Sequence, residues 1–253
     1  MISYHFKYFT MKKSTYYLIL AFVTLILSSC TTTLYVPNAV NTPLLKEKHE
    51  FKATIGPNNA QAAFGLTDNF GIIANGYWDK FKSETTTNGQ TTQTLNKGNL
   101  YELGLGYYKP LTKVIVFETY LGGGLGNINL NQDNGTKRYD VKGTKFFVQP
   151  SIGYVDRFLE VAITPRLSAV KYNGLETFGY SQKELEEEFL VKSEVEDKTW
   201  LFIEPTLTVR AGFKYVKLQG QIGFSSKLTK GDLKYQSKLT SIGLLVDIAK
   251  WYK

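Results

Sequence analysis

Alternation of apolar and polar residues is the main pattern through most of this chain. The stretch FLEVAITPRLSAV at 158–170 is an example, because Leu159 and Ile163 share one face of an extended strand while Glu160 and Arg166 share the other. A period of two residues predicts a β-strand with one oily face and one mixed, partly charged face. What the strand does depends on which of these two faces meets water.

Ten segments with this alternation follow one another, and turn residues separate them. A chain of this length fits one domain of barrel size. We therefore predict an all-β, antiparallel, up-and-down barrel of about ten strands. The expected strands are 48–55, 59–67, 70–81, 98–109, 113–127, 142–155, 158–171, 198–210, 213–225 and 236–248.

The connections between these strands differ in length. Tight turns are expected at 56–59, 67–69, 110–112, 156–157 and 211–212, and longer loops at 82–97, 128–141, 172–197 and 226–235. Short turns at one end and long loops at the other are typical of transmembrane barrels.

The mixed faces are rich in Gly, Ser, Thr and Ala, with a few carboxylates and arginines and little lysine. Such a face suits a narrow interior in which charges pair, so we expect the oily face to meet lipid. The predicted barrel is therefore a transmembrane one. The inward charged residues would form a salt-bridge network or a polar path for a small solute: Glu102, Glu118, Glu160, Arg166, Glu204, Arg210 and Asp247.

The N-terminus has the features of an export signal. Lys12 and Lys13 precede an apolar run of about 12 residues, which is shorter than the ~20 that a membrane helix needs. Met11 is a plausible true start. The run ends in Leu27-Ser28-Ser29-Cys30, which resembles the lipobox of bacterial lipoproteins.

This resemblance implies that residues 1–29 are a signal peptide and that Cys30 carries fatty acyl chains, such as palmitate, after cleavage. Two or three chains, at ~0.8 kcal/mol per buried CH₂, anchor a protein firmly to a membrane. Residues 30–47, with Pro37 and Pro43, would then be a lipidated tether that leads to a barrel domain at 48–253.

The barrel segment is similar to small outer-membrane β-barrels, and its last strand, 241–248, is similar to their assembly signal. With the lipobox, the chain resembles lipidated barrel proteins of Bacteroidetes-type envelopes. The resemblance implies an outer-membrane location, with both termini facing the periplasm and the long loops outside. Expected partners are outer-membrane lipid and the barrel-assembly and lipoprotein-sorting machineries.

Charge and composition argue against several other classes of function. After cleavage the 27 basic and 22 acidic residues would give a net charge of +5, which is mildly basic, and an export signal disfavours nucleic acid as a partner. After cleavage the chain would hold one histidine, His49, and one cysteine, Cys30. These counts argue against a catalytic triad and a zinc site. We expect no enzyme activity, no metal and no cofactor besides the lipid.

Three further features have ordinary explanations or none. The glycines of 122–126 make room inside the barrel more plausibly than they bind phosphate. Ser181 and Glu184 have capping-box spacing, so the acidic segment 181–197 is expected to begin with a short solvated helix, with divalent-cation binding as the less favoured alternative. The mid-strand prolines Pro150, Pro165 and Pro205 have no explanation from the sequence.

These expectations favour a lipid-anchored outer-membrane barrel that is not an enzyme and has a structural or small-solute-binding role. The first alternative is a soluble, lipocalin-like periplasmic barrel that is tethered by Cys30 and binds an apolar ligand. An outer-membrane hydrolase that uses His49 is the weakest alternative.

Overall fold

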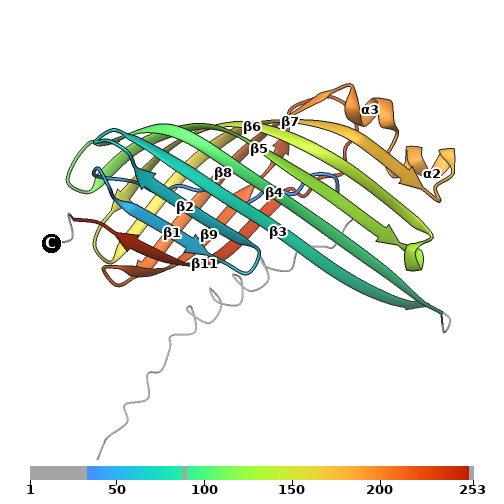
Figure 1. The fold of residues 1–253 in the computed structure, drawn as a ribbon, viewed down its shortest axis with the longest axis horizontal. Coiled ribbons are helices and arrows are strands. Elements are labelled where there is room, and N and C mark those ends of the chain that lie inside the picture. The colour runs from blue at the N-terminus through green and yellow to red at the C-terminus, as the bar shows by residue number, and fades with distance from the viewer. Residues whose placement is uncertain (1–32, 88–89, 251–253) are drawn as a thin grey trace, which may run out of the picture. The chain divides into compact units, whose positions relative to one another are not determined.

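The protein forms an antiparallel β-barrel in the computed structural model, which describes residues 33–87 and 90–250 (Figure 1). The predicted signal peptide at 1–29, Met11 and Cys30 lie outside the described residues. The strands are β1 (Phe51–Ile55), β2 (Asn59–Gly65), β3 (Phe70–Thr87), β4 (Gln90–Pro110), β5 (Ile115–Gln132), β6 (Lys137–Val155), β7 (Leu159–Phe178), β8 (Thr199–Gly212), β9 (Val216–Phe224), β10 (Ser226–Lys227) and β11 (Lys238–Ile248).

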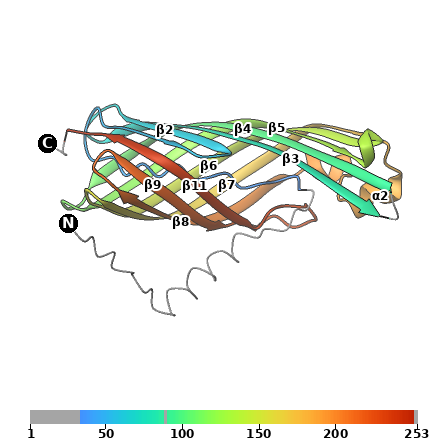
Figure 2. The same ribbon diagram turned by 90° about the horizontal axis from the view of Figure 1, so that it is seen from below.

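Strand pairing closes the barrel. Neighbours in sequence pair from β1 to β9, and β1 pairs with β11, which pairs with β9. The two-residue β10 extends the wall beside β8. Ten strands thus form a closed ring. Figure 2 shows the barrel from a second side. The predicted fold class is confirmed.

The two faces of each strand are distributed as the sequence predicted. Leu159 is 42% exposed and Ile163 58%, whereas Glu160 and Arg166 are almost completely buried. Other strands follow the same rule, and their outer surface carries large exposed side chains such as Leu103, Leu121, Leu125, Phe146, Leu218 and Ile242. Because exposed apolar patches of this extent are rare on soluble monomers, the outer face is that of a barrel in lipid.

The two ends of the barrel differ. The connections 66–69, 111–114, 156–158 and 213–215 lie at one end, which we call the turn end. The connections at 179–198 and 228–237 lie at the opposite, loop end. A tilted strand needs only 9–11 residues to cross a membrane, so β4, with 21, extends beyond it.

Two predicted loops are wrong. Residues 82–97 and 128–141 are mostly extended, because β3 pairs with β4 and β5 with β6 almost to the tips of their hairpins. Cross-strand hydrogen bonding therefore continues through polar, Thr- and Asn-rich sequence that lacks the oily face of a membrane strand. Periodicity alone does not detect such strands.

The helices lie at the loop end. A single 3₁₀ turn, η1 (Asp133–Gly135), joins β5 to β6, and α2 (Gln182–Glu187) and α3 (Lys192–Glu196) lie between β7 and β8. The predicted capping box at Ser181 and Glu184 is present at the start of α2. Among the described residues, no helix is both long and apolar enough to cross a membrane.

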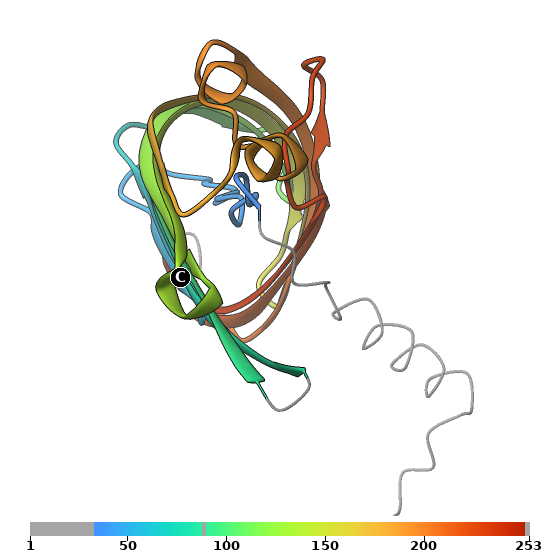
Figure 3. The ribbon, with the colours of Figure 1, turned by 90° about the vertical axis from the view of Figure 1, so that its right-hand side faces the viewer.

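The segment before β1 runs through the inside of the barrel, as the view along the barrel in Figure 3 shows. Twelve of residues 33–45 are buried. We call residues 33–45 the plug. The sequence predicts a tether over 30–47 that precedes the barrel domain; residues 33–45 of this segment lie enclosed in the lumen.

The three prolines lie at one level of neighbouring strands. Pro165 lies directly opposite Pro205, and the pairing of β6 with β7 is interrupted around Pro150 and Pro165 without a change of register. Proline has no N–H to donate to a ladder, which accounts for the interruption. Nothing in the structure explains why three prolines gather there.

Candidate functional site

The plug begins among aromatic residues near the loop end. The Tyr35 ring stacks on Phe202 with 4.1 Å between ring centroids, and its hydroxyl donates to Glu204 at 2.5 Å. The Tyr172 hydroxyl donates to the Leu34 carbonyl at 2.7 Å. These contacts belong to a hydrophobic cluster that also includes Trp200. The start of the plug is thus packed as tightly as a domain core.

Midway down the lumen, Asn38 lies among four charged side chains: Glu102, Lys145, Arg166 and Glu204, which we call the central cluster. Its amide nitrogen donates to Glu102 at 2.6 Å, and its amide oxygen accepts from Lys145 at 3.1 Å and Arg166 at 2.9 Å. One plug side chain therefore bridges both signs of charge.

Wall side chains also hydrogen-bond to the backbone of the plug. The carbonyl oxygens of Asn38, Val40, Asn41 and Thr42 accept from Arg166, Gln221, Gln149 and Arg210, respectively, at 2.6–3.1 Å. Buried backbone groups without secondary structure need such partners, because an unpaired carbonyl away from water is costly. The wall provides them from four different strands.

Near the turn end, a carboxylate holds the plug in an unusual conformation. Leu44 has a φ of 53°, a value that residues other than glycine rarely adopt. Its backbone N–H donates to buried Glu118 at 2.8 Å. Glu118, one of the predicted lumen charges, therefore contacts the plug backbone and lies outside the central cluster.

Two wall glycines make room for the leucines of the plug. A Cβ at Gly153 would lie 2.5 Å from Cδ1 of Leu44, and one at Gly71 would lie 2.8 Å from Cδ1 of Leu45. Any larger residue would collide with the plug. The barrel wall and the plug are thus complementary in shape as well as in hydrogen bonding.

A second group of charged side chains lies inside the barrel near the turn end. Glu160 accepts from Arg210 at 2.8 Å, Lys217 at 3.0 Å and Lys52 at 3.3 Å. Asp247 lies 3.3 Å from Lys52 and 3.6 Å from Lys217. We call these five residues the turn-side cluster. Its members come from β1, β7, β8, β9 and β11, the strands near the closing seam.

The structure places all seven predicted lumen charges inside the barrel and buries them. Six of them fall into the two clusters. Sequence reasoning missed Lys52, Lys145 and Lys217, which supply much of the compensating positive charge. The alternation could have identified Lys145, because it lies on the same face of β6 as Gln149 and Ser151.

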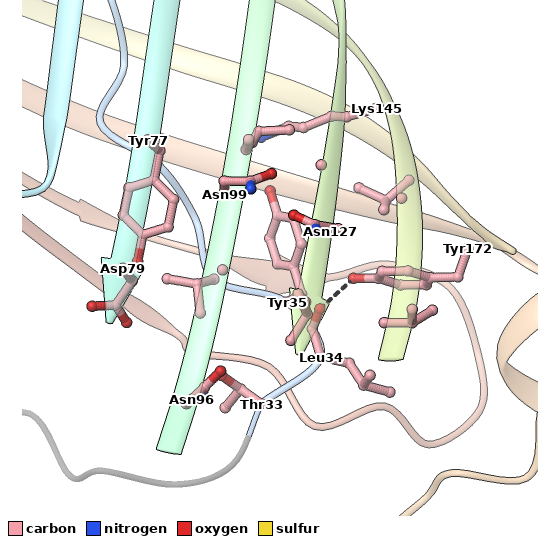
Figure 4. Close-up of a pocket in the computed structure, with 18 residues that line it drawn as sticks. Thr33, Leu34, Tyr35, Tyr77, Asp79, Asn96, Asn99, Asn127, Lys145 and Tyr172 are labelled. Carbon is pink, nitrogen blue, oxygen red and sulfur yellow. Dashed lines mark hydrogen bonds between the residues drawn. The ribbon is translucent and has the colours of Figure 1, made fainter. Parts of the chain in front are cut away.

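A cavity of about 70 Å³ lies between the plug and the taller wall, on the loop side of the central cluster (Figure 4). We call it the vestibule. Tyr35 and Leu34 of the plug line one side, and Tyr77, Asp79 and Asn96 line the other. Tyr172 and Lys145 are also among its lining residues. Aromatic rings beside amide, carboxylate and ammonium groups offer both stacking surfaces and hydrogen bonds.

The other predicted candidates lie apart from this site. His49 is exposed, its ring lies 6.0 Å from that of Phe64, and no hydrogen bond joins its imidazole to a carboxylate among the described residues. In the acidic segment, Glu184 pairs with Lys137 at 2.6 Å, and Glu188 pairs with Lys234. No group of three or more metal-ligating side chains occurs in the part of the chain that the structure describes.

Hydrogen bonds at the start of α2 perturb the pKa of Glu184. The hydrogen bond from Lys137, together with those from Ser181, lowers the pKa of its carboxyl to about 2. The predicted helix is thus held to the β6 hairpin by charge. This arrangement fixes a surface loop.

Comparison with known proteins finds similarity among solved structures and not among sequences. No protein-family model matches the chain, and no curated protein matches it. The translocator domain of the autotransporter NalP from Neisseria meningitidis is similar in structure, with 12% sequence identity and a TM-score of 0.45 over 94% of this chain and 85% of that one. A likeness at this level carries no argument about function, so the barrel assignment here depends on its own strand pairing and burial.

Proposed function

We propose that this chain is a lipid-anchored outer-membrane barrel whose lumen is closed by its own N-terminal segment, and that it is not an enzyme. The distribution of side chains between the two faces is the observation that carries the proposal. Arg166 and Arg210 are buried inside, while Leu103 and Leu121 are about 70% exposed outside. In water this arrangement would be inverted, whereas in a bilayer both faces meet a suitable surrounding.

Membrane extraction of a Cys30→Ser variant tests this proposal. The variant is exported by a cleavable signal so that it carries no lipid. We expect it to remain in the outer-membrane fraction after carbonate and high-salt washes and to need detergent for release. Recovery in the soluble periplasm would contradict the proposal and favour the lipocalin-like alternative.

The lipid itself is tested separately. After growth with an alkyne-tagged palmitate, the wild-type chain should acquire the tag, and the Cys30→Ser variant should not. Equal tagging of both chains, or of neither, would contradict attachment at Cys30. This outcome leaves the barrel assignment untouched, since the two experiments have different readouts.

Solute binding in the vestibule is a second candidate function, favoured by Tyr35, Tyr77 and Tyr172 beside polar groups at the loop end. We infer that its ligand class is a small polar solute with hydroxyl groups, since aromatic faces and amides suit such molecules. From a panel of small polyols and neutral monosaccharides, the members that fit a cavity of about 70 Å³ should raise the melting temperature of the detergent-solubilised protein. Tyr77→Ala should abolish the shift, and Tyr101→Ala, on the outer face, should keep it.

The two alternatives have less support. A lipocalin-like protein needs an apolar interior, whereas this lumen holds two clusters of buried charges and a bound segment of its own chain. A hydrolase that uses His49 would need an orienting carboxylate at the imidazole. If a hydrolytic activity is found, its loss in His49→Ala would revive that alternative.

A further inference from the structure

The plug connects opposite ends of the barrel. At the loop end, the backbone N–H of Leu34 donates to the Lys234 carbonyl at 2.9 Å, within the connection 228–237. Just beyond the plug, at the turn end, the Lys46 ammonium donates to the Lys113 carbonyl at 2.6 Å, within the connection 111–114. The chain therefore enters the lumen at the loop end and leaves it at the turn end.

The end of the barrel sequence lies at the turn end as well. Phe51, the first residue of β1, pairs with Ile248, the last residue of β11. An up-and-down barrel with an even number of strands brings its two strand termini to the same end. The described chain does not start at that end, however, because the plug runs through the lumen from the loop end to the turn end before β1 begins. As a result, Thr33 and Ile248 lie at opposite ends.

We propose that the chain before Thr33 emerges on the loop-end side of the membrane, so that a lipid on Cys30 enters the leaflet on that side. This inference rests on the proposed function. Three residues of chain span at most about 11 Å, so Cys30 is tied to the mouth where the plug begins. If the long loops face outward, as the sequence predicts, the anchor lies in the outer leaflet and not on the periplasmic side expected earlier.

The contacts of the plug make this direction of the chain specific. Asn38 is matched to the central cluster, and Leu44 and Leu45 are matched to glycines of the wall. A reversed or withdrawn segment would leave Glu102 and Arg166 without these partners. The observed direction is therefore the one that satisfies the buried groups of the wall.

The anchor would also secure the plug. Acyl chains at the loop end cannot follow the plug through a lumen lined by Arg166, Glu160 and Arg210, because buried charges exclude hydrocarbon. Withdrawal of the plug toward the turn end would then require extraction of the lipid from its leaflet. The lipid thereby becomes a stop that holds the plug in place.

Labelling of single cysteines on intact cells tests the proposal. In full-length Cys30→Ser protein exported by a cleavable signal, one cysteine is introduced as Thr31→Cys, Lys183→Cys or Arg157→Cys. Lys183 lies on α2 at the loop end, and Arg157 lies in the turn-end connection 156–158. Both side chains are exposed, so a membrane-impermeant maleimide can reach each from its own side.

We expect Thr31→Cys to label together with Lys183→Cys on intact cells and Arg157→Cys to label only after permeabilisation. Labelling of Thr31→Cys together with Arg157→Cys would overturn the inference while leaving the membrane barrel intact. Protection of all three positions until permeabilisation would instead contradict the spanning barrel and, with it, the inference. If Thr31→Cys and Lys183→Cys are both protected while Arg157→Cys labels, Thr31 and the loop end still lie on the same side of the membrane. That side is then the periplasm, and the lipid lies in the inner leaflet of the outer membrane.

Discussion

The two charge clusters of the lumen have a similar composition and different tasks. The central cluster holds two acids and two bases and surrounds Asn38, a side chain of the plug. The turn-side cluster joins β1 to β11 and β9 at the seam of the barrel, and it meets the plug through the Thr42 carbonyl, which accepts from Arg210.

This difference separates closure of the barrel from retention of the plug. Any residue at position 42 would supply the same carbonyl, whereas only a side chain with both a donor and an acceptor can replace Asn38. The turn-side cluster should therefore govern global unfolding, and the central cluster should govern how firmly the plug is held. The following variants are ordered from the largest expected effect to the smallest.

Glu160→Gln should have the largest effect on global stability. It leaves Lys52, Arg210 and Lys217 buried without their shared carboxylate, and loss of one partner of a buried ion pair costs about 3–5 kcal/mol. Equilibrium unfolding by urea in lipid vesicles measures the change. Glu187→Gln, on an exposed helix position, is the matched control and should leave the midpoint unchanged. A loss below about 1 kcal/mol for Glu160→Gln would contradict the role of the seam.

Asn38→Ala should release the plug while the barrel stays folded. Removal of hydrogen bonds to charged partners costs about 2–3 kcal/mol locally, because Glu102, Lys145 and Arg166 each lose a contact. Amide hydrogen exchange within 33–45 should become faster by at least about tenfold, with exchange in β8 unchanged. Equal acceleration in both segments would show that the clusters are not independent.

Gly153→Ala tests the fit of the plug against the wall. The new methyl group would lie 2.5 Å from Leu44, and overpacking of this kind costs about 1–3 kcal/mol. Gly220→Ala is the control, because its Cβ would meet nothing within 4 Å. A thermal unfolding series should show a loss for the first variant alone. Equal changes in the melting temperature for the two variants would contradict the close contact between Leu44 and Gly153.

Thr42→Val should have a small effect. It removes one neutral hydrogen bond to Thr164, worth about 1 kcal/mol, and keeps the carbonyl that Arg210 binds. Exchange within 33–45 should change less than in Asn38→Ala. An effect as large as that of Asn38→Ala would remove the distinction between the two clusters.

Acidification should loosen α2 without opening the lumen. Hydrogen bonds from Lys137 and Ser181 lower the folded-state pKa of Glu184 to about 2 from its ordinary value of 4.5. The stabilisation is therefore complete above about pH 4.5 and is lost as the pH falls toward 2. Proteolysis of segment 179–198 by an acid-active protease should show this dependence in the wild type. Glu184→Gln should lack it.

The wall of the barrel was largely predictable from the sequence, because each strand repeats a period of two. Glu160 and Arg166 lie on the same face of β7, and Glu204 and Arg210 lie on the same face of β8. Register then places Glu160 opposite Arg210 and Arg166 opposite Glu204. The alternation along each strand is therefore enough to predict which of these charged residues face inward.

The plug was not predictable in this way. Residues 33–45 have no periodicity, and their partners are side chains scattered over most of the wall. Long-range contacts of irregular backbone leave no local pattern. One signal was available, since 31–45 contain no charged residue, which is unusual for a solvated tether. The same limit applies to the long hairpins, whose strands pair through backbone hydrogen bonds and whose outer surface lacks the apolar residues of a membrane strand.

Amide hydrogen exchange of the wild-type protein in lipid vesicles tests the central claim, that the N-terminal segment fills the lumen, most directly. The account predicts that peptides covering 33–45 exchange slowly, at rates comparable with those of β7 and β8, because Leu44 donates to buried Glu118 and the segment is enclosed. Exchange of these peptides within seconds, as in a free tether, would contradict it.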